Sequence, residues 1–231
     1  MPQTLSIAVC LSDGVTLSDF ITPIEILASL NSGDRPASKG AMVDLPYRVT
    51  FDYLAPTMAP VVSYQGLLAP TLNPTLTYVD CAAAEKQFDI IWVPAGPGPD
   101  FGTGVSHIPE EEIAFIVQQA PKAKYVMSVC TGAFQLALAG VLEGKRATTN
   151  KLFFKTIVGA TSKNIQWVPQ ARWVIDGNVW TSSGVTAGSD MALAFVEHLI
   201  SAKVARHIRG EFEIPEVTET NDLFAVFHGL V

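Results

Sequence analysis

The chain has 231 residues, of which 48% are hydrophobic and 16% charged, and its formal net charge at pH 7 is −7. This composition excludes a disordered chain, and the length suits one α/β domain over 1–231. Because the 15 Lys and Arg residues form no run, the acidic chain lacks the electrostatic footprint of a nucleic-acid-binding protein.

The first half of the chain begins with a strand and a helix. The apolar stretch LSIAVCL predicts a buried strand over 5–11, and apolar positions at helical spacing predict a helix over 19–30. Gly, Ser, Asp and Pro residues predict a surface loop over 31–44, and PYRVTFDYLA predicts the second strand. The stretch that follows, as far as Cys81, holds four prolines and predicts short strands or a hairpin.

The second half alternates strands and helices more regularly. The run FDIIWVPAGPGPD, at 88–100, is typical of a central parallel strand that enters a loop. The further predicted elements are helices over 109–120, 130–140, 186–201 and 201–214, strands over 124–129 and 144–150, and a hairpin over 173–181. This alternation predicts an open, mostly parallel sheet with helices on both faces, and the tail over 213–231 is expected to wrap the surface or a partner subunit.

The sequence also indicates where the protein is located and whether it holds a metal. The evidence comes from its apolar runs, its cysteines and its histidines. No apolar run reaches the roughly 18 uncharged residues of a membrane span, and the N-terminus lacks the marks of a signal peptide, so we expect a cytoplasmic protein without membrane contact. An odd number of widely spaced cysteines agrees with a reducing compartment. The four histidines show no metal-binding spacing, and we predict no metal.

The stretch KYVMSVCTG places one cysteine at a strand-to-helix junction. Small residues two positions before and after Cys130, Ser128 and Gly132, are what a sharp turn of this kind needs. The helix N-terminus is expected to favour the thiolate, which predicts a nucleophile. The alternative is that Cys130 only packs the end of the strand, which is also our interpretation of Cys10 and Cys81.

A nucleophile needs an anion site and a group that transfers protons. The segment VPAGPG ends the other long strand, and we expect the backbone N–H groups of Gly96 and Thr131 to be the donors, although VPAGPG could equally be a plain strand-to-loop junction. A phosphate cradle over 102–107 is poorly supported because the third glycine of a dinucleotide fingerprint is absent. Asp19, at the start of the first helix, is a candidate for proton transfer, but its spacing alone also fits an N-cap.

Four motifs together, VPAGPG, KYVMSVCTG, GKRATTN and SSGVTAGSDMAL, resemble the DJ-1/ThiJ/PfpI superfamily and, within it, the isocyanide (isonitrile) hydratases. The resemblance covers about 5–212, nearly the whole chain. It implies a flavodoxin-like α/β sandwich with a nucleophile elbow, a homodimer, and an enzyme that acts on a small electrophilic substrate without a cofactor.

The resemblance also implies roles for individual residues. Cys130 takes the part of the nucleophile that attacks the isocyanide carbon, and Asp19 that of the acid and base while water is added to give an N-formyl amine. Thr131 supplies a hydroxyl or an amide to the intermediate. The chain departs from the family where T-T-H-W becomes Thr148-Thr149-Asn150-Lys151, which removes a histidine, and at P-A-G-P-G and D-F-I-T-P, which change the pocket wall.

Several functional hypotheses remain open at this stage. The leading one is a cysteine-dependent hydratase or hydrolase, and a glyoxalase-like activity on 2-oxoaldehydes is a second enzymatic candidate. A redox sensor or stress protein, in which Cys130 is oxidised, is the non-enzymatic candidate. A ligand-sensing module fused to a DNA-binding region is disfavoured, because too little chain follows residue 212.

Overall fold

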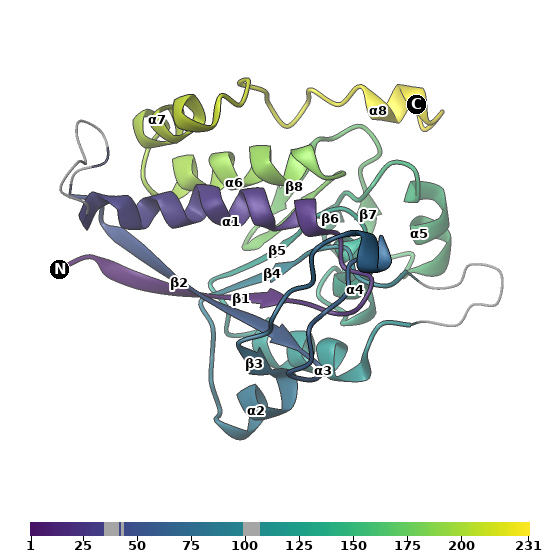
Figure 1. The fold of residues 1–231 in the computed structure, drawn as a ribbon. Helices are drawn as coiled ribbons and strands as arrows, with labels where there is room; N and C mark the ends of the chain where they lie inside the picture. The colour runs from purple at the N-terminus through teal and green to yellow at the C-terminus, as the bar shows by residue number, and fades with distance from the viewer. Residues whose placement is uncertain (35–41, 43, 99–106) are drawn as a thin grey trace.

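A computed structural model describes all residues except 35–41, 43 and 99–106, and its centre is a seven-stranded sheet in the order β3-β2-β1-β4-β5-β9-β8 (Figure 1). Neighbouring strands run parallel except β8 on β9. The strands are β1 (Gln3–Cys10), β2 (Tyr47–Ala55), β3 (Leu76–Thr77), β4 (Ile90–Val93), β5 (Tyr125–Ser128), β8 (Trp173–Asp176) and β9 (Val179–Ser182). A separate parallel pair joins β6 (Arg146–Ala147) to β7 (Gln166–Trp167). The predicted mostly parallel sheet is confirmed.

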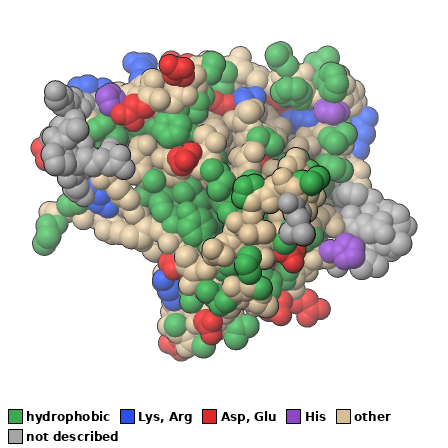
Figure 2. Space-filling view, viewed as in Figure 1, with side chains coloured by type: hydrophobic (Ala, Val, Ile, Leu, Met, Phe, Trp, Pro, Cys, Tyr) green, Lys and Arg blue, Asp and Glu red, His purple; other side chains and the backbone are tan. Residues whose placement is uncertain are grey.

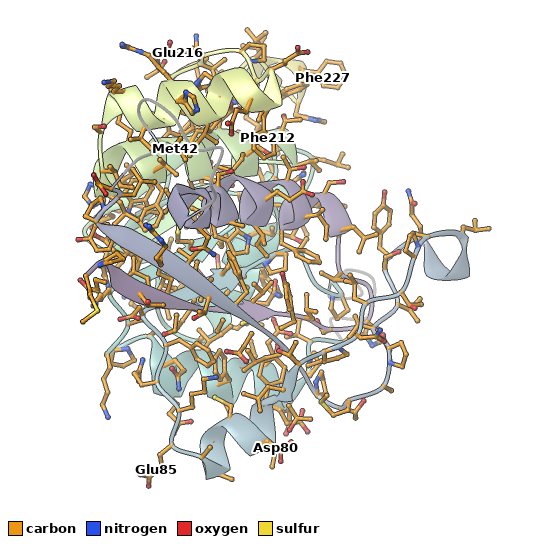
Figure 3. The ribbon with its side chains drawn as sticks, turned by 60° about the vertical axis from the view of Figure 1, so that its left-hand side comes forward. Met42, Asp80, Glu85, Phe212, Glu216 and Phe227 are labelled. Carbon is orange, nitrogen blue, oxygen red and sulfur yellow. The ribbon has the colours of Figure 1, made fainter. Side chains whose placement is uncertain are left out.

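Helices cover both faces of this sheet, as Figure 1 shows. On one face lie α1 (Ile21–Ala28) and α6 (Thr186–Leu199), with α7 (Ala202–Phe212) packed on α6, and on the other lie α2 (Tyr78–Ala83), α3 (Glu110–Gln119) and α4 (Gly132–Leu138). The short helices α5 (Phe154–Ala160) and α8 (Phe224–Phe227) lie near one end. In Figure 3, Phe212 and Phe227 lie at the α6–α7 side, whereas Asp80 and Glu85 project from the opposite side.

Two apolar cores follow from the two-residue period of the strands. Ile7 and Val9 of β1 pack into the core beneath α1 and α6, whereas Ala8 and Cys10 pack into the core against α2, α3 and α4. Because alternate side chains of a strand point to opposite faces, one apolar run serves both cores. The continuous hydrophobicity of β1 and β4 therefore reflects burial on both faces, as predicted.

Several local predictions differ from the structure. The helix predicted over 19–30 is shorter, because Leu17–Asp19 forms a 3-10 turn and α1 starts at Ile21, which places Asp19 before the helix. The strand predicted over 144–150 is the two-residue β6, which joins β7 and not the central sheet. Cys81 lies in α2 and is fully buried, in agreement with a structural role.

The C-terminal segment is anchored by a buried ion pair. Lys151 Nζ lies 3.2 Å from Asp222 Oδ2, and both side chains are 2% exposed. Lys151 also donates to the carbonyl of Ala171 at 2.8 Å. Beyond this anchor, α8 exposes an apolar patch made of Leu223, Phe224, Val226 and Phe227. Hydrophobic side chains gather at the upper right of Figure 2, where α8 lies in Figure 1.

The sheet brings three loops together at one edge. β4 pairs in parallel with β1 on one side and with β5 on the other, so the carboxyl ends of all three strands point the same way. The backbone N–H of Val129 donates to Val93 O at 3.0 Å, and that of Thr16 to Ala95 O at 3.0 Å. The segments after β1, β4 and β5 therefore meet, at the place where open α/β sheets bind ligands.

Candidate active site

The turn after β5 holds Cys130 in a conformation that non-glycine residues rarely adopt. Cys130 has a φ of 60°, in the left-handed region, and Thr131 is the N-cap of α4. Such a residue costs on the order of 1–3 kcal/mol and persists where its surroundings fix it. Here the Cys130 N–H donates to Ser183 O at 2.8 Å, and the Thr149 hydroxyl donates to Cys130 O at 2.8 Å. The predicted elbow is present and is held from two other segments.

Two glycines allow the elbow to pack. A Cβ at Gly132 would overlap the carbonyl oxygen of Val93, so only glycine fits where α4 crosses the end of β4. A Cβ at Gly188, in the T-A-G segment of α6, would lie 2.8 Å from Val129 Cγ1. The first contact fits the elbow against the end of β4, and the second fits the T-A-G helix start against the residue before Cys130.

Asp19 is fully buried beneath the elbow. Its Oδ2 accepts a hydrogen bond from the Ala95 N–H at 3.0 Å, and its carbonyl oxygen accepts one from Trp92 Nε1 at 3.1 Å. The N-cap of α1 is Phe20, so the N-cap interpretation of Asp19 is wrong. Within the described part of the chain, its Oδ1 has no hydrogen-bond partner other than the neighbouring Cys130 thiol, which affects the pKa of Asp19.

Burial dominates the electrostatics of this pair. It raises the pKa of Asp19 from 3.8 to about 7, against the opposing hydrogen bonds from Ala95 and Cys130. Burial and the negative charge of Asp19 raise the pKa of Cys130 from 9.0 to about 12, against hydrogen bonds from the Thr131 backbone and the Asn150 side chain. The thiolate expected at the helix N-terminus is therefore disfavoured, since desolvation outweighs the short helix. The two groups titrate as a pair, which loses its first proton near pH 7.

Asn150 stands where the family resemblance leads one to expect a histidine, and it contacts the sulfur. Its Nδ2 donates to Cys130 Sγ at 3.2 Å, while its Oδ1 accepts from the Leu152 N–H at 2.9 Å. The sequence signalled this position only as a departure from T-T-H-W. Residues 130 and 150 come together because Thr149 binds the carbonyl of Cys130.

Gly96 also lines the pocket wall beside Cys130. Its N–H donates to no residue that the structure describes, so it remains available to a ligand. A Cβ here would lie 2.9 Å from both Gln135 Nε2 and Ser12 Oγ, which leaves glycine as the fitting residue. The loop is also braced from beneath, because Gln135 Nε2 donates to Pro94 O at 3.3 Å.

Sequence reasoning missed Glu112, which is fully buried behind this wall. Its Oε1 accepts from Gln135 Nε2 at 2.8 Å, and burial raises its pKa. The sequence EEE looks like an ordinary acidic first turn. However, Glu112 shares a helix face with the buried Phe115, Ile116 and Gln119, three, four and seven positions later, and that spacing could have signalled its burial.

The described residues enclose a pocket of about 570 Å³ that opens onto the sulfur. Three of the predicted residues, Cys130, Thr131 and Gly96, line it, and Asp19 lies buried below it. Its remaining wall is largely apolar and includes Ile108, Phe134, Phe153, Ile157 and Val185. Since no Lys, Arg or His is among the described lining residues, the pocket favours an uncharged, apolar ligand.

Three further predictions concern a metal site, a phosphate cradle and a membrane span. Within the described residues, no group of three or more His, Cys, Asp or Glu side chains could hold a metal ion. Most of the stretch 102–107, considered above as a phosphate cradle, lies outside the described residues. No helix in the described ranges is long and apolar enough to cross a membrane.

The chain is similar in sequence and in fold to several known proteins. The chain is 38% identical over 159 residues to an isonitrile hydratase of Pseudomonas putida, a match that spans 68% of this chain and 62% of that protein. It is 30% identical over 102 residues to a deglycase of Pyrococcus horikoshii, which spans 44% of this chain and 56% of that protein. The crystal structure of a ThiJ/PfpI family protein from Pseudomonas syringae has a TM-score of 0.70 at 25% identity and covers 95% of this chain and 79% of that one.

The family comparison agrees with the fold and the elbow. The matched region spans less than two thirds of the hydratase's own length. The DJ-1/PfpI family matches residues 5–198, which include the central sheet, apart from the first two residues of β1, and the turn at Cys130. The chain therefore belongs to the DJ-1/PfpI family.

Proposed function

We propose that this protein is a cysteine-dependent hydratase that adds water to an isocyanide and releases an N-formyl amine. The observation that carries the proposal is the buried pair of Cys130 and Asp19 at the floor of an apolar pocket. The pair combines a nucleophile with an acid whose pKa is about 7, which is the value general acid–base catalysis at neutral pH needs. The isonitrile hydratase relative supports the substrate class.

In the first step the pair adds across the isocyanide carbon. With one proton left on the pair, that proton is on the Cys130 thiol; the carboxylate of Asp19 takes it as the sulfur forms the S–C bond and delivers it to the same carbon. The product is a thioimidate, R–N=CH–S–Cys130, and Asp19 is left as a carboxylate. Because Asp19 Oδ1 has no other described hydrogen-bond partner, it is free to transfer this proton.

In the second step water completes the reaction. The carboxylate of Asp19 takes a proton from water as the oxygen bonds to carbon, and passes that proton to the nitrogen. The tetrahedral carbon then expels the sulfur, the hydroxyl proton returns to the pair, and R–NH–CHO leaves. The Gly96 N–H, which donates to no described residue, would hydrogen-bond the developing oxygen from the pocket wall.

The pocket wall supports a substrate with a bulky, uncharged R group. Phe134, Phe153 and Ile157 would contact an alicyclic or aromatic ring, whereas no described lining side chain would pair with a carboxylate or a phosphate. Burying an unpaired anion there would be costly. We therefore expect apolar isocyanides to react faster than those that carry a charged group.

The direct test is formation of N-formyl amine from an alicyclic and an aromatic isocyanide, followed by mass spectrometry. Because the pair loses its first proton near pH 7, kcat/KM is expected to rise about tenfold per pH unit below that value and to level off above it. Asp19→Asn should lower turnover by roughly 10²-fold or more. Wild-type protein that forms no formamide at any pH would refute the hydratase proposal.

A second candidate, a glyoxalase-like or deglycase activity, is supported by the Pyrococcus horikoshii relative. Methylglyoxal is small and polar, and this activity is disfavoured because no described residue that lines the pocket is a histidine. Lactate production from methylglyoxal by wild type, abolished in Cys130→Ala, would favour this second candidate if isocyanides were inert. If the protein converts neither isocyanides nor methylglyoxal, and peroxide adds oxygen selectively to Cys130, the redox-sensor hypothesis would be supported.

The cellular setting belongs to the same proposal. We propose a cytoplasmic homodimer, because all three cysteines are free thiols and the family resemblance implies two copies. Light scattering on the purified full chain would test the oligomeric state, since a homodimer should have twice the mass of 24.8 kDa.

A further inference from the structure

Asn150 presents a fixed hydrogen-bond donor to the nucleophile. Nδ2 lies 3.2 Å from Cys130 Sγ, and Oδ1 accepts the Leu152 N–H at 2.9 Å. Because a backbone N–H can only donate, the second bond determines which end of the carboxamide faces the sulfur. The amide also fits closely against the chain, since a Cβ at Gly184 would lie 3.1 Å from Nδ2. Its orientation is therefore set by the backbone and not by the state of the thiol.

We propose that Asn150 is a further catalytic residue, a non-titrating donor that supports the thiolate of Cys130 and holds it for attack. A hydrogen bond to a charged acceptor is stronger than one to a neutral acceptor, so this contact favours the ionised sulfur. It thereby opposes the burial and the Asp19 charge that disfavour the thiolate. Its effect on turnover rests on the proposed function, whereas its effect on the thiol does not.

An imidazole at position 150 could gain or lose a proton, but the Asn150 carboxamide does not titrate. The protonation of the site therefore depends on Asp19 and Cys130. Asp19 is the titratable side chain whose charge acts on the sulfur. On the other side of Asn150, a second pocket of about 290 Å³ is bordered by further charged or titratable groups, namely Lys151, Arg172, Asp222 and His228. Lys151 is paired with Asp222, and Arg172 with Asp190 at 2.6 Å. Asn150 adds no charge to this balance.

The experiment measures alkylation of Cys130 by iodoacetamide as a function of pH, read from the mass of the Cys130 peptide. Asn150→Ala removes the donor. Asn150→Asp keeps an oxygen for the Leu152 N–H but faces the sulfur with a negative charge, so it separates support of the loop from support of the thiolate. Asn164→Asp makes the same chemical change at an exposed asparagine and is the matched control.

We expect alkylation at neutral pH to slow roughly 10- to 100-fold in Asn150→Ala and further in Asn150→Asp, with the rise in rate displaced to higher pH. The control should alkylate at the wild-type rate. Wild-type profiles in both Asn150 variants would overturn the proposal. If Asn150→Ala fails to fold in a thermal melt, Asn150→Asp decides, because it keeps the backbone contact.

Turnover of an isocyanide separates this proposal from the proposed function. Slower alkylation in the variants of a protein that forms no formamide would support the role of Asn150 toward the thiol and reject the substrate. Formamide formation together with unchanged alkylation in both variants would retain the hydratase and reject the role of Asn150.

Discussion

Two cysteines at the carboxyl ends of central strands lie near a buried carboxyl group, but only one of the two lines the pocket. Cys10 ends β1 and is 2% exposed, and burial together with the charge of Glu112 raises its pKa. Cys130 follows β5, and burial together with the charge of Asp19 raises its pKa in the same way. By burial and electrostatics alone the two thiols are similar.

The backbone makes the difference between them. Cys10 lies in a regular strand opposite Leu54, and its side chain packs into the core against α2, α3 and α4. Cys130 has a φ of 60° at the elbow, and its sulfur reaches the pocket and the Asn150 amide. A thiol beside a carboxyl group is therefore not a site by itself. The turn that gives the sulfur access to a ligand distinguishes the two.

The largest expected effect is on turnover, which should distinguish Cys130 from Cys10. Cys130→Ala should reduce formamide formation at least roughly 10³-fold, because Cys130 carries the only thiol among the described residues that line the pocket. Cys10→Ala should retain wild-type turnover and lose roughly 1 kcal/mol of unfolding free energy, measured with urea, because it leaves a small cavity. Equal activity in the two variants would contradict the assignment of Cys130.

The next largest expected effect is on the pH dependence of the unfolding free energy, and it comes from the buried carboxyl groups. The pKa of Asp19 in the folded chain is about 7, above its ordinary value of 3.8, so the folded state holds more protons between these values. This contribution to stability is complete below pH 3.8 and is lost as the pH rises through about 7. Its size is on the order of 4 kcal/mol.

Asp19→Asn removes this titration and should flatten the fall in unfolding free energy between about pH 4 and about pH 8. Glu112→Gln should change the slope in the same direction, because burial also raises the pKa of Glu112, but it should leave the pH dependence of turnover unchanged. Urea unfolding across this range measures both. A wild-type slope in Asp19→Asn would show that the ionisation of Asp19 costs no stability.

The smallest expected effect concerns the backbone of the elbow. Gly132→Ala should destabilise the protein by roughly 1–3 kcal/mol, because the new methyl group meets the Val93 carbonyl. Gly210→Ala is the matched control, since an added Cβ there meets nothing within 4 Å in α7, and it should stabilise by up to about 1 kcal/mol. Thermal melts compare them, and equal stability of the two variants would contradict the close packing of the elbow.

The sequence alone was sufficient for the features that depend on local pattern. The buried strands were predictable from continuous apolar runs, and the β8–β9 hairpin from the Asp-Gly-Asn turn. The elbow was predictable from the small residues Ser128 and Gly132 around Cys130. Each of these features depends on neighbours within a few positions along the chain, where periodicity and steric limits act.

The chemistry of the site was decided by the tertiary structure. The direction of the Cys130 pKa shift was predicted wrongly, because helix position is local whereas burial depends on segments far apart in the chain. Asp19 contacts Ala95 from a turn 76 positions earlier, and Asn150 reaches the sulfur from 20 positions later. Desolvation and neighbouring charge act through space, so the sequence determined the strands and the turn, and only their assembly determined which groups share a proton.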